Sequence, residues 1–322
     1  MHSPLSIRFW GTRGSFPVGT SRAALREHMV EAVHLAEGKP LKSRAEAEAF
    51  IDTIFPGTIP RFFGNNTSCV EILDDDADTH IFCDAGSGLC DAGQYWVDHG
   101  ASSGATYHLF ITHLHWDHIQ GFPFFPQIYI PGNRIIVHGF HENLEHAFRL
   151  QMSAPFFPVP FDALKASIAF EVHTPGVPFE VAGYTVHSIE QKHPGLSYGY
   201  RFEKAGKSIV YSTDSEHLEG VEEAGYPFVE FFKGTDVLIF DGMYSADDDA
   251  RKLEWGHSSS MMGVELAHRA QAKHLVLFHH DPTRTDEELE QSLSHAQNYA
   301  ADCDYDYPQD ISASYDGWEL NL

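Results

Sequence analysis

The chain has 322 residues, 43% of them hydrophobic and 21% charged, a composition that is ordinary for a globular protein and excludes fibrous and low-complexity classes. Its 21 Lys and Arg residues against 46 Asp and Glu residues give a formal net charge of −25. A chain this acidic repels phosphate backbones, so we expect no extended nucleic-acid partner. No apolar run approaches the ~18 residues of a membrane span and no signal-peptide pattern opens the chain, so no membrane partner is expected either.

The predicted elements begin with an apolar strand at 5–10, followed by a glycine-rich turn. Residues 21–55 then read as two helices that separate near Gly38–Pro40 and share an intermittent apolar face. From residue 69 onward, short apolar runs between turn residues predict strands, and longer runs at helical spacing predict helices. We expect strands at 69–73, 80–84, 107–111, 134–137, 167–172, 185–189, 197–202, 208–212, 237–240 and 274–278, and helices at about 88–98, 259–272 and 285–301.

The predicted strands come first and then alternate with helices. This order favours an α/β class, in which helices cover sheets, and not a helical bundle. Neither a Gly/Ser linker nor an internal repeat is visible, so a single domain spanning residues 1–322 is predicted. The four cysteines form no CxxC pair, and free thiols are typical of a reducing compartment. We therefore expect a cytoplasmic protein.

The 22 histidines are unusually many for this length, and the densest group lies in Thr-His-Leu-His-Trp-Asp-His at 112–118. His113 and His115 are two positions apart, so in extended backbone they project to the same side and can share one metal ion. If the chain turns helical there, Asp117 and His118 point toward a second ion. Imidazole and carboxylate groups suit zinc, manganese or iron. The alternative, scattered surface histidines, fits poorly with four ligand-type residues in six positions.

Two metal sites need further ligands from distant strands, and three residues have suitable positions. His193 lies between two predicted strands, and Asp214 and His279 each follow an apolar strand. Side chains at the ends of neighbouring strands converge in α/β scaffolds. Each residue alone would be interpreted as structural, but beside the first cluster we interpret all three as ligands. His280 adjoins His279, and the residues alone leave the choice between these two open.

These motifs resemble the metallo-β-lactamase superfamily of αββα hydrolases. The His-x-His-x-Asp-His stretch with its separate His, Asp and His carries the general resemblance. The stretches at 9–15, 66–69, 84–88, 199–202 and 212–214 (FWGTRGS, NTSC, DAGSG, GYRF and STD) resemble its phosphodiesterase branch, which includes ribonuclease Z and the PhnP-type cyclic-phosphodiester hydrolases. The resemblance implies a four-layer αββα sandwich, to which the helical insertion at 21–55 is an addition.

The resemblance also implies two divalent metal ions, zinc or manganese, with iron as the alternative. A hydroxide between two such ions is a strong nucleophile at neutral pH, because the metals lower the pKa of bound water. The ions also neutralise phosphoryl oxygens, which supplies the positive potential that the acidic chain lacks. By this resemblance, one ion is held by His113, His115 and His193, the other by Asp117, His118 and His279, and Asp214 bridges the two.

Further residues are candidates for roles around the ions. His257 matches a family motif in which a histidine assists the leaving group, so it is a predicted catalytic residue together with Asp117; a helix-entry histidine near an N-cap serine is the alternative. Asp241 is a candidate for orienting His257, and Asp84 for accepting a hydrogen bond from a ligand imidazole. Arg13, in the glycine-rich turn, is a candidate phosphate contact, with a solvated turn arginine as the alternative.

The predicted function is hydrolysis of a small phosphodiester, a cyclic nucleotide or a cyclic sugar phosphate. An RNA-processing endonuclease of the ribonuclease Z type shares the chemistry, but no basic stripe or basic arm is visible in the sequence. A lactone or thioester hydrolase has no evident need for His257, and a non-catalytic metal-holding protein would usually lack a ligand.

Two further segments are candidates for roles near the site: an insertion that the family pattern lacks and an aromatic, Pro-rich stretch. The insertion at 21–55 is interpreted as a lid, a specificity wall or a homodimer contact, with a surface decoration of no function as the alternative. Phe156, Phe157 and Phe161, in a Pro-rich stretch, are candidates for stacking on a nucleobase, with packing among themselves as the alternative.

Overall fold

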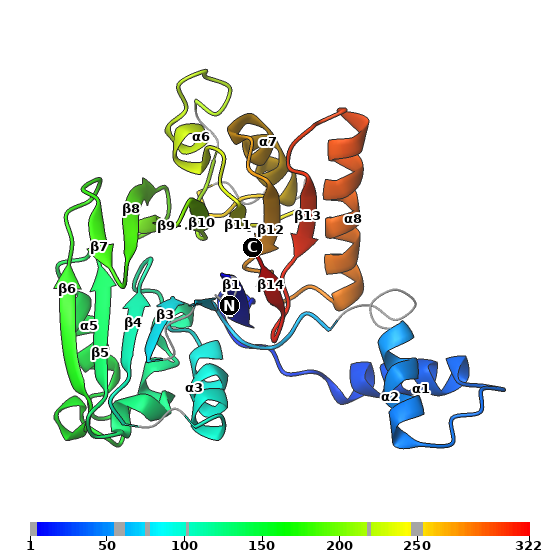
Figure 1. Cartoon of the computed structure of the whole chain (residues 1–322), viewed down its shortest axis with the longest axis horizontal. Helices are drawn as coiled ribbons and strands as arrows, with labels where there is room; N and C mark the ends of the chain where they lie inside the picture. The colour runs from blue at the N-terminus through cyan, green and yellow to red at the C-terminus, as the bar shows by residue number, and fades with distance from the viewer. Residues whose placement is uncertain (1–4, 55–61, 75–77, 101–102, 218–219, 246–253) are drawn as a thin grey trace.

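Two seven-stranded sheets face each other, and helices cover their outer sides (Figure 1). The structure is a computed structural model, and it describes residues 5–54, 62–74, 78–100, 103–217, 220–245 and 254–322. The arrangement confirms the αββα sandwich expected from the sequence. Among the described residues, no helix is both long and apolar enough to cross a membrane.

The first sheet combines an antiparallel part with four parallel strands. Strands β3 to β6 run parallel, whereas β1 pairs antiparallel with both β2 and β14. Its order is β14-β1-β2-β3-β4-β5-β6, formed by β1 (Ser6–Gly11), β2 (Cys69–Leu73), β3 (Thr79–Cys83), β4 (Thr106–Phe110), β5 (Arg134–Gly139), β6 (Ser167–Val172) and β14 (Glu319–Asn321).

The second sheet has a matching division. Strands β10 to β13 run parallel, and β7 to β10 form an antiparallel meander. Its order is β13-β12-β11-β10-β9-β8-β7, formed by β7 (Phe179–Val181), β8 (Tyr184–Gln191), β9 (Ser197–Lys204), β10 (Lys207–Ser212), β11 (Val237–Asp241), β12 (His274–Phe278) and β13 (Asp310–Ala313).

Three hydrophobic clusters hold the layers together. One lies between the sheets, with Ile7 and Phe110 from the first sheet and Ile239 from the second. The other two fill the spaces between each sheet and its helices. The helices are α3 (Gly88–Asp98), α4 (Trp116–Ile119) and α5 (Leu144–Gln151) with the first sheet, and α6 (Pro227–Phe232), α7 (Ser260–Ala270) and α8 (Asp286–Asp302) with the second.

Central strands that are buried on both faces explain the continuous apolar runs of the sequence. Every residue of β11 is buried, for example, and this strand was predicted within one residue of its observed end.

The insertion forms two helices, α1 (Arg22–Leu35) and α2 (Arg44–Ile54), as expected; residue 55 lies outside the described residues. Strands β7, β13 and β14 and helices α5 and α6 were not predicted.

The parallel strands place the functional residues. The carboxyl ends of parallel strands meet at one edge of a sheet. Asp84 follows β3, and the 112–118 stretch follows β4 in the first sheet. Asp214 and His279 follow β10 and β12 in the second. The two sheets therefore present their candidate residues at a common edge of the sandwich.

Candidate metal centre

The seven predicted ligands come together at this edge, although they span more than half of the chain. Their ligand atoms fall into overlapping groups in which all atoms lie within 4.8 Å of one another. The groups include His113, His115 and His193; Asp117, His118 and His279; and His113, His118 and Asp214.

Asp214 lies between the two outer groups, and its two oxygens face different histidines. Oδ1 is 3.7 Å from Nε2 of His113 and 3.7 Å from Nε2 of His193. Oδ2 is 3.3 Å from Nε2 of His118 and 3.3 Å from Nε2 of His279. The side chain is 2% exposed. One buried carboxylate thus offers one oxygen to each half of the cluster.

The 112–118 stretch adopts the expected geometry. His115 is the extended N-cap residue of the short helix α4, so the chain turns helical at Trp116 and carries Asp117 and His118 toward the second group. Asp117 Oδ2 is 3.1 Å from Nε2 of His118, and it accepts a hydrogen bond of 2.8 Å from the backbone N–H of Ser15. The glycine-rich turn therefore contacts a predicted ligand directly, a contact that the sequence pattern did not predict.

Hydrogen bonds at the far ring nitrogens orient two of the imidazoles. Nδ1 of His193 lies 2.8 Å from the carbonyl oxygen of Gly256, and Nδ1 of His118 lies 2.7 Å from Oδ2 of Asp84. If each Nδ1 carries the proton, Nε2 presents its lone pair to the cluster. Gly256 has φ +85°, and a Cβ there would meet His193 Nδ1 at 2.3 Å, so this contact requires glycine.

Asp84 has the supporting position that the sequence suggested. It is fully buried, and besides His118 it accepts hydrogen bonds from the backbone N–H of Thr112 at 2.8 Å and from Tyr211 Oη at 2.9 Å. The carboxylate thus ties β3, the ligand loop after β4, and β10 together. Tyr211 and Thr112 were not singled out from the sequence, although each lies within three residues of a predicted ligand.

The backbone is in the left-handed region at three of these strand ends. The φ angle is +60° at Asp84, +56° at Asp214 and +60° at His279. Non-glycine residues rarely adopt this region, and those that do cluster at functional sites. Close packing accompanies the turn at His279, because a Cβ on Gly14 would lie 2.5 Å from its ring.

His257 stands between the two halves of the cluster. Its ring centroid is 5.1 Å from that of His193 and 5.1 Å from that of His279. Nδ1 lies 2.9 Å from Oδ2 of the fully buried Asp241. The N-cap of α7 is Ser259, whose hydroxyl accepts from Met262 N–H, so His257 itself does not cap the helix.

The structure separates His279 from His280. His279 joins the cluster, whereas the buried ring of His280 lies on the other side of the chain, with Nε2 2.8 Å from the carbonyl oxygen of Ser314. The left-handed φ of +60° at His279 turns the chain between the two rings. The choice that the residues alone left open is therefore settled in favour of His279 as the member of the cluster.

Arg13 differs from both expectations. It is 5% exposed, so it is not a solvated turn residue. Its guanidinium donates to the carbonyl oxygen of Gly64 and pairs with Asp286 at 3.2 Å. These contacts hold the glycine-rich turn against the start of α8, and they occupy the donors that a phosphate contact would need.

The chemistry of the donor set fits divalent cations. Nε2 of His113 is buried and has no hydrogen-bond partner, which is costly unless another group binds it. Nε2 of His118 and Nε2 of His279 lie only 3.3 Å apart. Burial alone would lower the pKa of His118, but the carboxylates of Asp214, Asp117 and Asp84 raise it well above the ordinary value. The cluster thus attracts positive charge and offers imidazole and carboxylate ligands to it.

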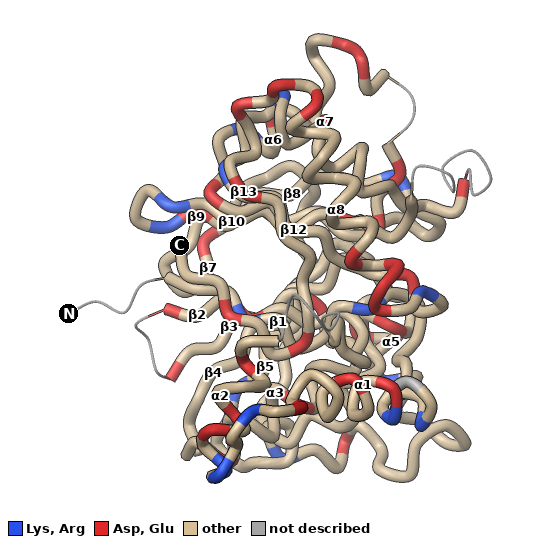
Figure 2. The backbone as a smooth tube through the Cα atoms, turned by 90° about the vertical axis from the view of Figure 1, so that its right-hand side faces the viewer, with Lys and Arg blue, Asp and Glu red and all other residues tan. Residues whose placement is uncertain are grey.

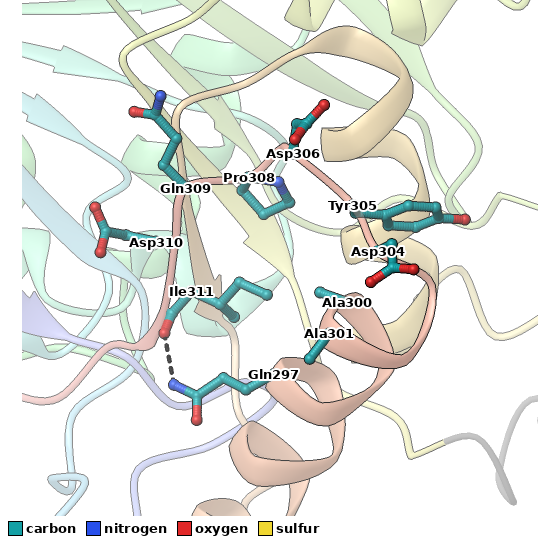
Figure 3. Close-up of a pocket in the computed structure, with 10 residues that line it drawn as sticks. All are labelled: Gln297, Ala300, Ala301, Asp304, Tyr305, Asp306, Pro308, Gln309, Asp310 and Ile311. Carbon is teal, nitrogen blue, oxygen red and sulfur yellow. Dashed lines mark hydrogen bonds between the residues drawn. The ribbon is translucent and has the colours of Figure 1, made fainter.

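A hollow elsewhere on the surface is a poor alternative site. It has a volume of about 650 Å³ and lies between α8 and β13, lined by residues between Gln297 and Ile311 (Figure 3). Its acidic side chains are Asp304, Asp306 and Asp310, and no histidine lines it. None of the predicted site residues belongs to it.

Comparisons with known proteins agree with the geometry. A family model described as a β-lactamase superfamily domain matches residues 79–280. Ribonuclease Z of Exiguobacterium sibiricum is 23% identical over 235 residues, which cover 56% of this chain and 73% of that protein. The metallo-β-lactamase fold protein YhfI from Bacillus subtilis has a TM-score of 0.65 at 16% identity, covering 99% of this chain and 100% of its own.

A diphosphatase from the PhnP family has the same fold, with a TM-score of 0.60 at 17% identity over 99% of this chain and 98% of that chain. The matched residues 79–280 contain all seven of the predicted ligands together with His257 and Asp241. The chain belongs to the metallo-β-lactamase superfamily.

Proposed function

We propose that the protein is a phosphodiesterase with two divalent metal ions, acting on a small phosphodiester. The observation that carries the proposal is the position of Asp214, whose two oxygens face His113 and His193 on one side and His118 and His279 on the other. A carboxylate in this position would help to hold two divalent ions, one in each half of the cluster. When bound, such ions lower the pKa of a coordinated water and neutralise phosphoryl oxygens.

His257 is suited to deliver a proton to the leaving oxygen. Burial alone would lower the pKa of His257, but the carboxylates of Asp241, then Asp214 and Asp117, outweigh this and raise the pKa to about 9. Its Nδ1 faces Asp241, so a proton on Nε2 is available on the other side of the ring. A protonated imidazole between the two halves of the cluster is placed to act as a general acid.

Exposed aromatic residues next to cluster residues in the chain support a substrate with a flat apolar group. Trp116, next to two ligands in the chain, is 67% exposed, and Trp255, next to the Gly256 carbonyl that orients His193, is 62% exposed. Phe16, which follows the Ser15 N–H that binds Asp117, is 50% exposed. Exposed rings at a binding site stack on nucleobases or other aromatic groups.

The aromatic stretch singled out from the sequence contributes less to this surface. Phe157 packs edge-on against Phe124, and Phe161 stacks with Phe122 and lies under the guanidinium of Arg149. Phe156 differs, because it is 66% exposed. Packing therefore accounts for two of the three phenylalanines.

Processing of RNA is the second candidate, and the relationship to ribonuclease Z favours it. The charge of the chain favours the small substrate, because an RNA partner needs many basic contacts. Figure 2 shows Lys and Arg in short separate stretches among more numerous Asp and Glu. The two substrates are separable by salt: cleavage of RNA would weaken steeply as salt rises, and cleavage of a small ester would not.

The test uses the purified full chain with Mn²⁺ or Zn²⁺ and bis(p-nitrophenyl) phosphate, a 2′,3′-cyclic nucleotide and a tRNA precursor as separate substrates. We expect turnover of the first two, loss of turnover with a chelator, and a loss of at least roughly 100-fold in Asp214→Ala. Asp98→Ala, which removes an exposed carboxylate of α3, is the matched control. No turnover of any phosphodiester, or equal turnover in Asp214→Ala and Asp98→Ala, would refute the proposal.

A further inference from the structure

Helix α1 of the insertion carries an apolar stripe whose side chains are exposed in the part of the chain that the structure describes. Leu25 is 53% exposed, Met29 61%, Val30 44% and Val33 73%. The spacing of these residues places them along one side of a helix. Together with Arg22 and Arg26 they line a shallow hollow of about 480 Å³. Side chains of this size are rarely left side by side in water unless another molecule covers them.

The rest of the insertion uses the other sides of α1. Phe50 and Ile54 of α2 are buried against Ala32, Leu35 and Ala36. On a further side, Ala23, Glu27 and His28 share a hollow with residues 282–287, before and at the start of α8. Figure 1 shows α1 and α2 set apart from the two sheets, beyond the lower end of α8. The stripe therefore belongs to neither of these contacts.

The charged residues at the two ends of the stripe have the opposite signs to those that the helix dipole favours. Arg22 lies in the first turn, Arg26 follows one turn later, and no acidic residue occupies the first turn. Cations near a helix N-terminus are unfavourable, because that end carries partial positive charge. The opposite end is followed by Glu37, whose side chain is 84% exposed. The N-terminal end of the stripe is thus basic, and its C-terminal end is next to an acidic residue.

We propose that α1 pairs with α1 of a second copy of the chain, antiparallel and about a two-fold axis near Met29. In this arrangement Leu25 of each copy meets Val33 of the other, and the two Met29 side chains meet at the axis. The Arg22 end of each helix lies against the Glu37 end of its partner, where the partial negative charge of the partner's C-terminus also favours cations. A parallel pair would instead bring the arginines of the two copies together.

A second copy fits this surface better than other occupants. A single stripe with opposite charges at its two ends is self-complementary, which a two-fold interface requires. An anionic membrane would be repelled by a chain with a net charge of −25. The pairing does not depend on the reaction, so it stands or fails separately from the proposed function.

The oligomeric state of the full chain is the first test. Sedimentation velocity should give a dimer, twice the chain mass of 36.1 kDa, at concentrations where Val33→Glu gives a monomer. Val177→Glu is the matched control, because Val177 is 54% exposed on the turn before β7 and should leave the dimer intact. A wild-type chain that stays monomeric, or a Val33→Glu variant that stays dimeric, would overturn the proposal.

Disulfide trapping tests the orientation. The exposed Cys303 is first replaced by serine. Met29→Cys should then form a disulfide-linked dimer on mild oxidation. A mixture of Leu25→Cys chains and Val33→Cys chains should form the mixed dimer faster than either variant alone forms its own. Faster trapping of like with like would show a parallel pair and contradict the antiparallel geometry. Circular dichroism of each variant verifies that α1 remains folded.

Discussion

Nδ1 of His257 lies 2.9 Å from Oδ2 of Asp241, and this pair links the candidate metal centre to the buried end of β11. The carboxylate is fully buried and also accepts hydrogen bonds from the backbone N–H groups of Met243 at 3.1 Å and Ser215 at 3.3 Å. Its position is therefore fixed by the fold. A fixed negative charge beside an imidazole stabilises the protonated form.

We predict that Asp241→Asn moves the alkaline limb of the pH profile of kcat/KM to lower pH. Burial lowers the pKa of His257, but Asp241, with smaller contributions from Asp214 and Asp117, raises it to about 9. Activity that needs protonated His257 is lost as the pH rises through this pKa. When the pKa falls, the loss therefore begins at a lower pH. His257→Gln should abolish this limb. An unchanged limb in Asp241→Asn, with metal content and melting temperature retained, would contradict the assignment.

Asp84→Asn should weaken metal binding by about 10–100-fold, the usual cost of losing a group that orients a ligand. The carboxylate lies 2.7 Å from Nδ1 of His118 and fixes the ring whose other nitrogen faces Asp117, Asp214 and His279. Competition with a chromogenic chelator measures the affinity. Tyr211→Phe removes one of the other hydrogen bonds to Asp84 and should have the smaller effect. Equal affinities in wild type and Asp84→Asn would exclude the orienting role.

The sequence pointed to most of the clustered residues because they lie at the ends of strongly apolar strands. Strand β12 and strand β4, which precedes the 112–118 stretch, are buried except at their first residue, so their ends are visible as the points where polar residues begin. The choice between His279 and His280 was not visible in this way. It depends on the left-handed φ of +60° at His279, which a residue pattern does not specify.

The parts that were missed depend on contacts between distant segments. Strand β7 has three residues, and it is defined by its pairing with β8 and not by a pattern of its own. Arg13 was interpreted from its place in a turn, whereas its partner Asp286 comes from the start of α8, far along the chain. The hydrogen bond from Ser15 N–H to Asp117 is of the same kind. Such contacts follow from the tertiary fold and have no local signal.

The exposed tryptophans predict a preference for substrates with an aromatic group. Thymidine 5′-p-nitrophenyl phosphate and methyl p-nitrophenyl phosphate share a leaving group, so their kcat/KM ratio isolates the contribution of the nucleoside. We expect Trp116→Ala and Trp255→Ala to lower this ratio on the order of tenfold each, since stacking of a base contributes about 1–3 kcal/mol. Val172→Ala, on edge strand β6 and 49% exposed, is the control. A ratio near one in the wild type would remove the basis for stacking.

A row of histidines away from the metal centre predicts how acid affects stability. Nδ1 of His138 lies 3.0 Å from Nε2 of His173, and its Nε2 lies 2.9 Å from Nδ1 of His108. Burial, followed by these two neighbours, lowers the pKa of His138 from 6.5 to about 2. Since the pKa is lowered in the folded state, the contribution to stability is full above pH ~6.5 and is lost as the pH falls toward 2, at about 1.4 kcal/mol per pH unit.

In the wild type, the free energy of unfolding should fall with pH between about pH 6.5 and pH 4. His138→Gln should make this slope less steep, by roughly the contribution of one proton. Chemical denaturation of the chelator-treated protein measures this slope. The chelator removes bound metal ions, so that their binding does not contribute to the slope. His34→Gln, at a side chain that is 72% exposed on α1, is the matched control and should keep the wild-type slope. The comparison is between slopes, so a uniform loss of stability in His138→Gln does not obscure it. Parallel slopes in wild type and His138→Gln would mean that His138 already takes up its proton in the folded state.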